Sequence, residues 1–227
     1  MANPDCRVIV TCEHGGNRVP RRECALFARA GRLLASHRGF DAGALDIARR
    51  LARAWRAPLV AATTTRLLVD LNRSPHNPAV FSAITRRLPR ARRDALLARH
   101  HRPHWQRVRE ALAASPAGAL HLAVHSFTPV LRGARRDFGI GILYDPKRRA
   151  ERERALAWQR RLARALPGVG VRRNAPYRGD GDGLTTALRR ELPANRYEGI
   201  ELELNQRLIA SAAQRRALAA ALAALLP

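Results

Sequence analysis

The stretch Arg7-Val-Ile-Val-Thr-Cys12, followed directly by Glu13-His14-Gly15-Gly16, decides the fold of this chain. Its β-branched run is typical of a short buried strand, and the polar residues and glycines after it indicate a turn. The two glycines let the backbone turn sharply, so we expect the His14 imidazole to stand uncovered at a sheet edge. The rest of the chain repeats this pattern of apolar strands that end in polar residues.

The periodicity of apolar residues predicts helices that alternate with strands. Residues 41–56 place apolar side chains at spacings of three and four, which indicates a helix that Pro58 ends. Further strands are predicted at residues 59–62, 66–71, 121–125, 139–144 and 199–204. Further helices are predicted at residues 89–114 with a break or new start at Pro103, 147–166, 184–190 and 206–226. This alternation predicts a three-layer α/β fold with a largely parallel sheet between helices, in a single domain over residues 1–227.

The charge of the chain is strongly positive. Its 227 residues include 42 Lys and Arg against 18 Asp and Glu, a net charge of +24. A positive field attracts polyanions, and the Arg-rich residues 86–109 favour a nucleic-acid-binding protein as one interpretation. The arginines are nevertheless spread along the whole chain, with few aromatic residues between them to stack on bases. We therefore expect a solvated Arg-rich surface and no specific nucleic-acid partner.

Composition also limits the class and location of the protein. A hydrophobic content of 46% excludes disorder by composition. No apolar run approaches the length of a membrane span and no signal-peptide layout is present, so we expect a cytoplasmic protein without a membrane partner. The three cysteines, Cys6, Cys12 and Cys24, lack CxxC spacing and are expected to be reduced thiols.

Polar residues follow several predicted strands at their carboxyl ends, where ligands bind in α/β sheets. His14 and His125 both lie at such ends, and two imidazoles can serve one Zn²⁺ in hydrolytic sites of the His₂-carboxylate type. His121 shares a strand face with His125, but we expect it to be a core histidine bonded to a backbone carbonyl. These positions suggest an enzyme.

Two carboxylates lie on one face of the last predicted strand. Glu201 and Glu203 alternate with apolar residues, and partial burial raises the pKa of a carboxyl toward the working range of a general base. Glu203 lies nearer the strand end and is our choice for that base, whereas Glu201 is expected to be structural.

The string Asp70-Leu-Asn-Arg73 offers a site for a carboxylate. Asn72 supplies an amide, and the planar guanidinium of Arg73 can bind a carboxylate by two parallel hydrogen bonds. Asp70 is expected to orient Arg73 from the preceding strand. A simple turn with Arg73 in water is the alternative interpretation.

Two other polar groups have weaker signals. Asp180-Gly-Asp-Gly183 lacks the twelfth-position Glu of an EF-hand, so we expect no Ca²⁺ site there. His100, His101 and His104 have helical spacing without a carboxylate or Cys, and a solvated Arg-rich helix explains them.

Eight strings occur in order along nearly the whole chain. They are Val10-Thr-Cys-Glu-His-Gly-Gly-Asn-Arg-Val-Pro20, Phe40-Asp-Ala-Gly-Ala44, Thr65-Arg-Leu-Leu-Val-Asp-Leu-Asn-Arg-Ser-Pro75, His121-Leu-Ala-Val-His-Ser-Phe-Thr-Pro129, Gly139-Ile-Gly-Ile-Leu-Tyr-Asp-Pro146, Asn174-Ala-Pro-Tyr-Arg-Gly179, Asp182-Gly-Leu184 and Ile200-Glu-Leu-Glu-Leu-Asn205. Taken together, these strings resemble the N-formylglutamate amidohydrolase family.

The resemblance implies a fold similar to that of zinc carboxypeptidases and aspartoacylase-like amidohydrolases, with a mixed, mostly parallel sheet between helices. It also implies roles for six residues. These are metal ligation by His14 and His125, binding of a substrate carboxylate by Arg66, Asn72 and Arg73, and acid or base catalysis by Glu203.

The third metal ligand is not given by the carboxypeptidase pattern. That pattern is His-x-x-Glu, and the third residue after His14 in this chain is Asn17. A His₂-carboxylate site then needs a carboxylate from elsewhere, for which Asp41 is our candidate and Glu13 the reserve.

The activity that the resemblance implies is zinc-dependent hydrolysis of an N-acyl amide on an acidic amino acid. The expected partner is a small anionic amide such as N-formyl-L-glutamate, a substrate of histidine degradation, which would give formate and L-glutamate. Another N-acyl amino acid or a small peptide, such as a cell-wall fragment, is the alternative substrate for the same fold.

Overall fold

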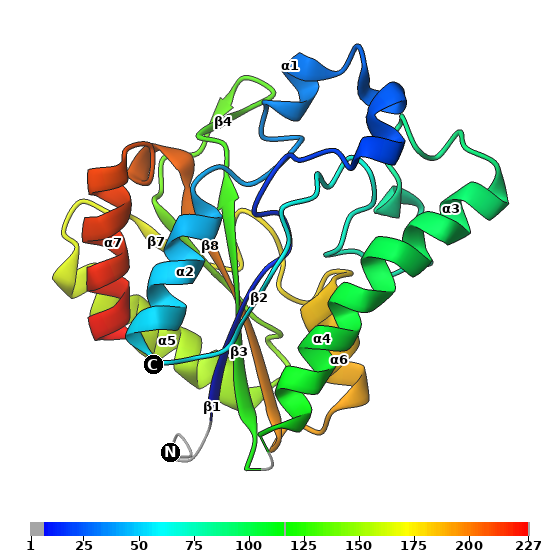
Figure 1. Ribbon diagram of the computed structural model, residues 1–227. Helices are drawn as coiled ribbons and strands as arrows, with labels where there is room; N and C mark the ends of the chain where they lie inside the picture. Colours follow the sequence, from blue (N-terminus) through cyan, green and yellow to red (C-terminus); the bar gives the residue numbers. More distant parts are fainter. Residues whose placement is uncertain (1–6, 116, 227) are drawn as a thin grey trace.

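The computed structural model describes residues 7–115 and 117–226, and a six-stranded sheet forms the middle of this structure (Figure 1). Its strands are β1 (Arg7–Cys12), β2 (Leu59–Ala61), β3 (Ala119–Phe127), β6 (Ile140–Leu143), β7 (Val171–Arg173) and β8 (Tyr197–Asn205). The strand order is β2-β1-β3-β8-β6-β7. β2, β1, β3 and β8 are parallel, whereas β6 is antiparallel to β8 and parallel to β7. The mixed, mostly parallel sheet is confirmed.

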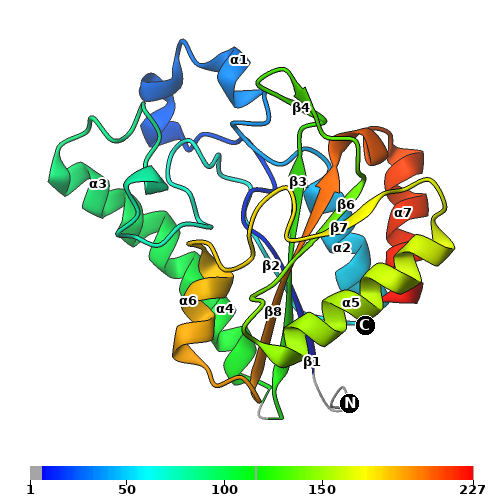
Figure 2. The same ribbon diagram turned by 180° about the vertical axis from the view of Figure 1, so that it is seen from behind.

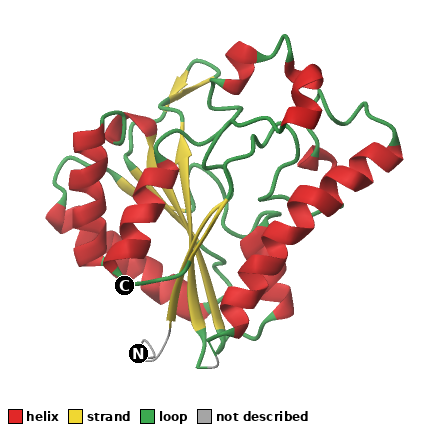
Figure 3. Cartoon of the chain, in the orientation of Figure 1, coloured by secondary structure: helices red, strands yellow, loops and turns green. Residues whose placement is uncertain are grey.

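Helices cover both faces of this sheet (Figure 3). One face is covered by α2 (Ala44–Ala54), α5 (Arg149–Ala165) and α7 (Ala212–Leu225), and the other by α4 (Arg102–Ala113) and α6 (Leu184–Glu191). The view from behind in Figure 2 shows the same two layers. Smaller elements lie beyond the carboxyl ends of β1, β3 and β8: α1 (Gly31–Leu34), α3 (Arg90–Leu96) and the hairpin of β4 (Val130–Leu131) and β5 (Ala134–Arg135). The three-layer α/β architecture is confirmed.

Strand alternation sorts the side chains of β3 and β8 by polarity. Leu122 and Val124 of β3 enter the core beneath α2, α5 and α7. His125 has the opposite orientation and lies in register with Glu203 of β8, on the face that α4 and α6 cover. His121 is buried as predicted, but its two ring nitrogens bond the hydroxyls of Thr11 and Tyr197 instead of a backbone carbonyl among the described residues. Apolar core and polar site therefore lie on opposite faces of the same strands.

Residues 66–71 are mostly buried and form turns at 66–68 and 71 with an irregular stretch between them, so the strand predicted there is wrong. A turn bond from the Leu68 amide to the Thr65 carbonyl replaces strand pairing. The apolar side chains of this segment fill two small clusters outside the main core. A short apolar run has the same periodicity in a paired strand and in a buried turn, and this ambiguity caused the error.

The helix predicted over residues 89–114 is helical throughout residues 90–113. α3 continues through a π-helical turn (Leu97–His101) into α4, whose first turn contains Pro103. The new start predicted near Pro103 is confirmed, and the backbone does not leave the helical conformation there. His101 and His104 are 2% and 1% exposed, so the interpretation of a solvated histidine cluster is wrong for these two. They lie on the side of the helix that packs toward the sheet.

Smaller differences concern the ends of the chain. The helix predicted over residues 206–226 begins only at Ala212, because Ser211 and Gln214 form a capping box there.

Cys12 and Cys24 are free thiols as predicted, and Cys6 lies outside the described residues. Within the described ranges, no helix combines the length and apolar character that a membrane span requires.

A buried ion pair joins α5, α6 and β8. Arg189 of α6 donates from Nε to both carboxylate oxygens of Glu151 of α5, at 3.0 and 3.1 Å. Gly199 of β8 donates its N–H to Glu151 at 2.9 Å and accepts from Arg189 at 2.7 Å. Glu151 is 0% exposed and Arg189 7% exposed, so each charge depends on the other for compensation.

We expect Glu151→Ala to lower the free energy of unfolding by about 3–5 kcal/mol, because it leaves the Arg189 charge buried without its partner. Urea denaturation measures this change. Glu153→Ala on the same helix is the matched control, because its carboxylate pairs with Arg149 at the surface and should change stability little. Equal losses in the two variants would contradict the structural role of the buried pair.

Candidate active site

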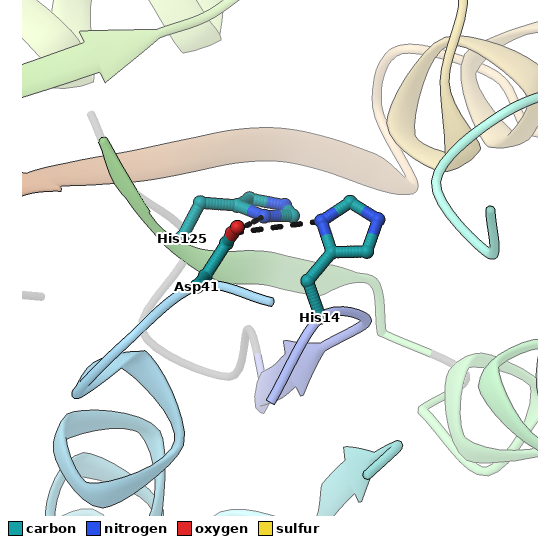
Figure 4. A group of neighbouring side chains, drawn as sticks. All are labelled: His14, Asp41 and His125. Carbon is teal, nitrogen blue, oxygen red and sulfur yellow. Dashed lines mark hydrogen bonds and ion pairs between the residues drawn. The ribbon is translucent and has the colours of Figure 1, made fainter. Parts of the chain in front are cut away.

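Three side chains from separate parts of the chain converge at the carboxyl ends of β1 and β3 (Figure 4). His14 follows β1, His125 lies near the end of β3, and Asp41 lies in the turn before α2. One ligand atom of each lies within 4.8 Å of those of the other two, and all three residues are buried. The fold thus brings together the histidines and the aspartate that the sequence singled out.

Backbone contacts hold Asp41 between the two histidines. Its amide nitrogen donates to the carbonyl oxygen of His14 at 2.9 Å, and Ser126 Oγ donates to the carbonyl oxygen of Ala42 at 3.0 Å. Gly43 closes the turn at a φ of +81°, a conformation that favours glycine. Asp41 is therefore tied to both strand ends that carry the imidazoles.

The His14 imidazole is 2% exposed, so the expectation that it stands uncovered is wrong. Its two neighbouring glycines allow close packing of the backbone instead. A Cβ atom would meet the Ala62 carbonyl oxygen at 2.9 Å if placed on Gly15, and the Thr63 carbonyl oxygen at 2.7 Å if placed on Gly16.

Each imidazole has a carboxylate at both of its ring nitrogens. His14 Nδ1 and His125 Nδ1 lie 3.5 and 3.0 Å from Oδ2 of Asp41. On the outer side, His14 Nε2 lies 2.7 Å from Oδ1 of Asp70, and His125 Nε2 lies 3.2 Å from Oε2 of Glu13. Metal-binding histidines typically donate their second ring N–H to a carboxylate in this way.

The chemistry of this group fits a divalent cation. His14 Nδ1 is buried and forms no hydrogen bond within the part of the chain that the structure describes. Burial raises the pKa of the Asp41 carboxyl, but His14 and His125 together outweigh burial and lower that pKa below its usual value. An ionised carboxylate with two imidazoles is a ligand set that Zn²⁺ prefers.

Glu203 lies in β8, across the ladder from His125. It is 5% exposed, and its Oε2 has no hydrogen-bond partner among the described residues. Burial raises the pKa of Glu203 to about 7. Glu201 is engaged instead, because its Oε1 accepts a hydrogen bond from Thr185 at 2.6 Å. The pKa of Glu203 suits a group that accepts and releases a proton near neutral pH.

Asp70 orients Arg66 and not Arg73, which corrects the prediction. Arg66 donates from Nε and Nη2 to Oδ2 of Asp70 at 3.1 and 2.7 Å, and its Nη1 lies 3.5 Å from Oδ1 of Asp41. Arg73 reaches the backbone carbonyl of Asp182 at 3.1 Å. The turn at residues 66–71 folds Arg66 back over Asp70, which a strand would not do.

The loop before α6 fixes the turn that contains Asn72. Oδ1 of Asn72 accepts from the Leu184 amide at 3.0 Å. Oδ2 of Asp182 accepts from the Ser74 amide at 3.0 Å and from Nδ2 of Asn77 at 2.6 Å. The acidic, glycine-rich loop noted in the sequence therefore holds the adjacent turn in place.

All seven predicted site residues line one cavity of about 450 Å³. They are His14, Asp41, Arg66, Asn72, Arg73, His125 and Glu203. His37, Thr128 and Tyr177 also line it and were not predicted. His37 and Tyr177 lie in loops, whereas Thr128 directly follows β3, a strand-end signal that could have identified it.

His104 also has a neighbour at the site that the sequence did not indicate. Its Nε2 lies 3.6 Å from Oε1 of Glu13, and both residues are buried. Burial raises the pKa of Glu13, but His104 and His125 outweigh burial and hold it well below its usual value. Glu13, the reserve for the third ligand, contacts Nε2 of His125, whereas Asp41 contacts Nδ1.

Comparisons with known proteins bear on this site. The family described as N-formylglutamate amidohydrolase matches residues 6–210. Gene product Atu2144 from Agrobacterium tumefaciens has a similar structure, with 31% identity and a TM-score of 0.84 over 97% of this chain and 88% of that chain. N-formylglutamate amidohydrolase from Ralstonia eutropha JMP134 has 18% identity and a TM-score of 0.73 over 97% of this chain and 91% of that chain. No curated protein matches the chain.

The family match spans most of the chain and includes every residue that the structure gathers around the cavity. The mixed sheet and its helical layers agree with the similar solved structures. The chain is an amide-hydrolysing enzyme that belongs to the N-formylglutamate amidohydrolase family.

Proposed function

We propose that the protein is a zinc-dependent amidohydrolase that cleaves N-formyl-L-glutamate to formate and L-glutamate. One observation carries the proposal. A His-Asp-His group, the free carboxyl of Glu203 and the guanidinium of Arg73 line the same cavity of about 450 Å³. Family membership supports an N-acyl amino acid as the substrate class.

The residues that would hold the metal are His14, Asp41 and His125. When bound, Zn²⁺ polarises the amide carbonyl and makes water a better nucleophile at neutral pH. Asp70 lies at the outer ring nitrogen of His14 and keeps this imidazole in orientation.

Glu203 moves the protons of the reaction. Its carboxylate lines the cavity, takes a proton from the attacking water and delivers this proton to the amide nitrogen as the C–N bond breaks. A pKa of about 7 suits both steps, because the carboxyl gains and loses a proton with little cost near neutral pH.

Arg73 supplies the positive charge for a substrate carboxylate. It donates to a backbone carbonyl and forms no ion pair with a carboxylate in the described part of the chain. Arg66 already has Asp41 and Asp70 beside it, so its charge is largely compensated. Its remaining N–H groups donate to the same substrate carboxylate that Arg73 binds. The Asn72 amide adds a neutral donor beside them.

A hydrolysis screen with the zinc-loaded protein tests the proposal. N-formyl-L-glutamate should be cleaved faster than its N-acetyl counterpart, N-formyl-L-leucine or a short cell-wall peptide. Arg73→Ala should raise KM for the formylglutamate substrate and change KM for N-formyl-L-leucinamide, which has no carboxylate, much less. Faster cleavage of a peptide or of another acyl group would reassign the substrate within the same fold.

We expect Glu203→Gln to retain zinc and lose about 10²–10⁴-fold in turnover, because the amide cannot carry the proton. Steady-state kinetics and zinc content measure the two properties. Glu201→Gln is the matched control on the same strand and should lose much less. Wild-type turnover in the Glu203 variant would exclude Glu203 as the base.

We expect His14→Ala and His125→Ala each to abolish stoichiometric zinc, because a ligand set of one imidazole and one carboxylate is too small for a tight site. Elemental analysis of the purified proteins measures the content. His121→Ala removes a buried imidazole on the same sheet face and should keep its zinc. Full zinc content in both ligand variants would exclude the proposed metal site.

A further inference from the structure

A buried carboxylate and a buried imidazole lie behind His125, on the side away from Asp41. Glu13 follows the end of β1 and is 0% exposed, and His104 of α4 is 1% exposed. Glu13 reaches His125 Nε2 with one oxygen at 3.2 Å and His104 Nε2 with the other at 3.6 Å. Three side chains from three elements therefore form a row that ends at the proposed metal site.

The row bears on which nitrogen of His125 is available for a metal. Nδ1 faces Asp41 at 3.0 Å, and Nε2 faces Glu13. With a metal at Nδ1 the ring proton of His125 would lie on Nε2, and a carboxylate there would accept this N–H. Among the described residues Glu13 is the nearest carboxylate to Nε2, because Glu201 lies 3.9 Å away and is bonded to Thr185. Asn72 Nδ2 lies 3.4 Å from Nε2 and is a donor, so it cannot replace Glu13 as the acceptor.

His104 is the second imidazole that lies beside the Glu13 carboxylate. Neither oxygen of Glu13 has a hydrogen bond of good geometry within the described residues, and a buried carboxylate is costly unless positive or donor groups face it. His104 Nε2 lies 3.6 Å from the Glu13 oxygen that does not face His125, and both side chains are buried. The His104 ring therefore limits the positions that the Glu13 carboxylate can adopt beside His125.

The helix that carries His104 is itself fixed to the site. Trp105 donates its indole N–H to the carbonyl oxygen of Leu71 at 2.7 Å. The His101 ring lies 2.8 Å from the carbonyl oxygen of Arg73 and stacks on Trp105, with ring centroids 4.7 Å apart. The inner face of α4 is therefore held against the turn that contains the substrate-binding residues, and His104 is held with it.

We propose that Glu13 and His104 are positioning residues that orient His125 for the metal, an inference that rests on the zinc site proposed above. Neither residue belongs to the ligand group or lines the cavity.

Zinc affinity, measured by competition with a chromogenic chelator, tests this role without reference to turnover. Glu13→Gln and His104→Leu should weaken zinc binding about 10–100-fold, because loss of a carboxylate behind a metal-binding histidine typically has that effect. His104→Gln keeps an N–H donor for Glu13 and should recover most of the affinity. His121→Leu is the matched control, because His121 is a buried imidazole on the same face whose partners are the hydroxyls of Thr11 and Tyr197.

A second readout follows the proton directly. In zinc-loaded protein labelled with ¹⁵N at histidine, the Nε2–H of His125 should give a slowly exchanging signal that is lost in Glu13→Gln and kept in His121→Leu. A purely structural role for Glu13 would leave this signal in place.

Three results would overturn the inference. If wild-type protein binds zinc and the Glu13→Gln and His104→Leu variants bind it as tightly, the positioning role is wrong and the proposed function stands. If His104→Gln is as weak as His104→Leu, His104 acts by packing and not as a donor. If the wild-type protein binds no zinc, the proposed metal site and this inference fail together.

Discussion

One carboxylate shared by two buried imidazoles is the interaction on which this site depends. Asp41 lies 3.5 and 3.0 Å from the Nδ1 atoms of His14 and His125, and its backbone is bonded to the strand ends that carry them. These three titratable side chains are all buried. Such a group is stable only when each charge faces an opposite one or a donor, and the rest of the active site provides these partners.

The residues around Asp41, His14 and His125 supply these opposite charges and donors. Asp70 faces His14 and Arg66, and Glu13 faces His125 and His104, so acids and bases alternate outward from Asp41. Glu203 is the exception, because one of its oxygens has no partner in the described structure. The same burial that the other carboxylates overcome by pairing raises the pKa of Glu203 to about 7, which suits a residue that carries protons.

Much of this arrangement could be predicted from the sequence, because it depends on the spacing of apolar residues and on which residues lie at the ends of strands. Alternation places His125 and Glu203 on one face of adjacent parallel strands, and the carboxyl ends of parallel strands meet at one edge. What could not be predicted depends on contacts between distant segments. Residues 66–71 have the pattern of a strand but pack as a turn, which turns Arg66 toward Asp70, and His104 has the pattern of a solvated helix but faces the sheet.

The sequence by itself determined the three-layer fold, the family and the side chains that gather at the sheet edge, because apolar period, turn residues and strand ends are local properties. Only the tertiary structure decided which of those side chains pair with one another and which remain unpaired. It placed Asp41 and not Glu13 between the Nδ1 atoms, and it bonded Thr185 to Glu201 and not to Glu203. It also paired Arg66 with Asp41 and Asp70, whereas Arg73 has no ion pair among the described residues. Ion pairing and desolvation depend on which groups meet in space, and these groups come from segments up to 190 residues apart, between Glu13 and Glu203.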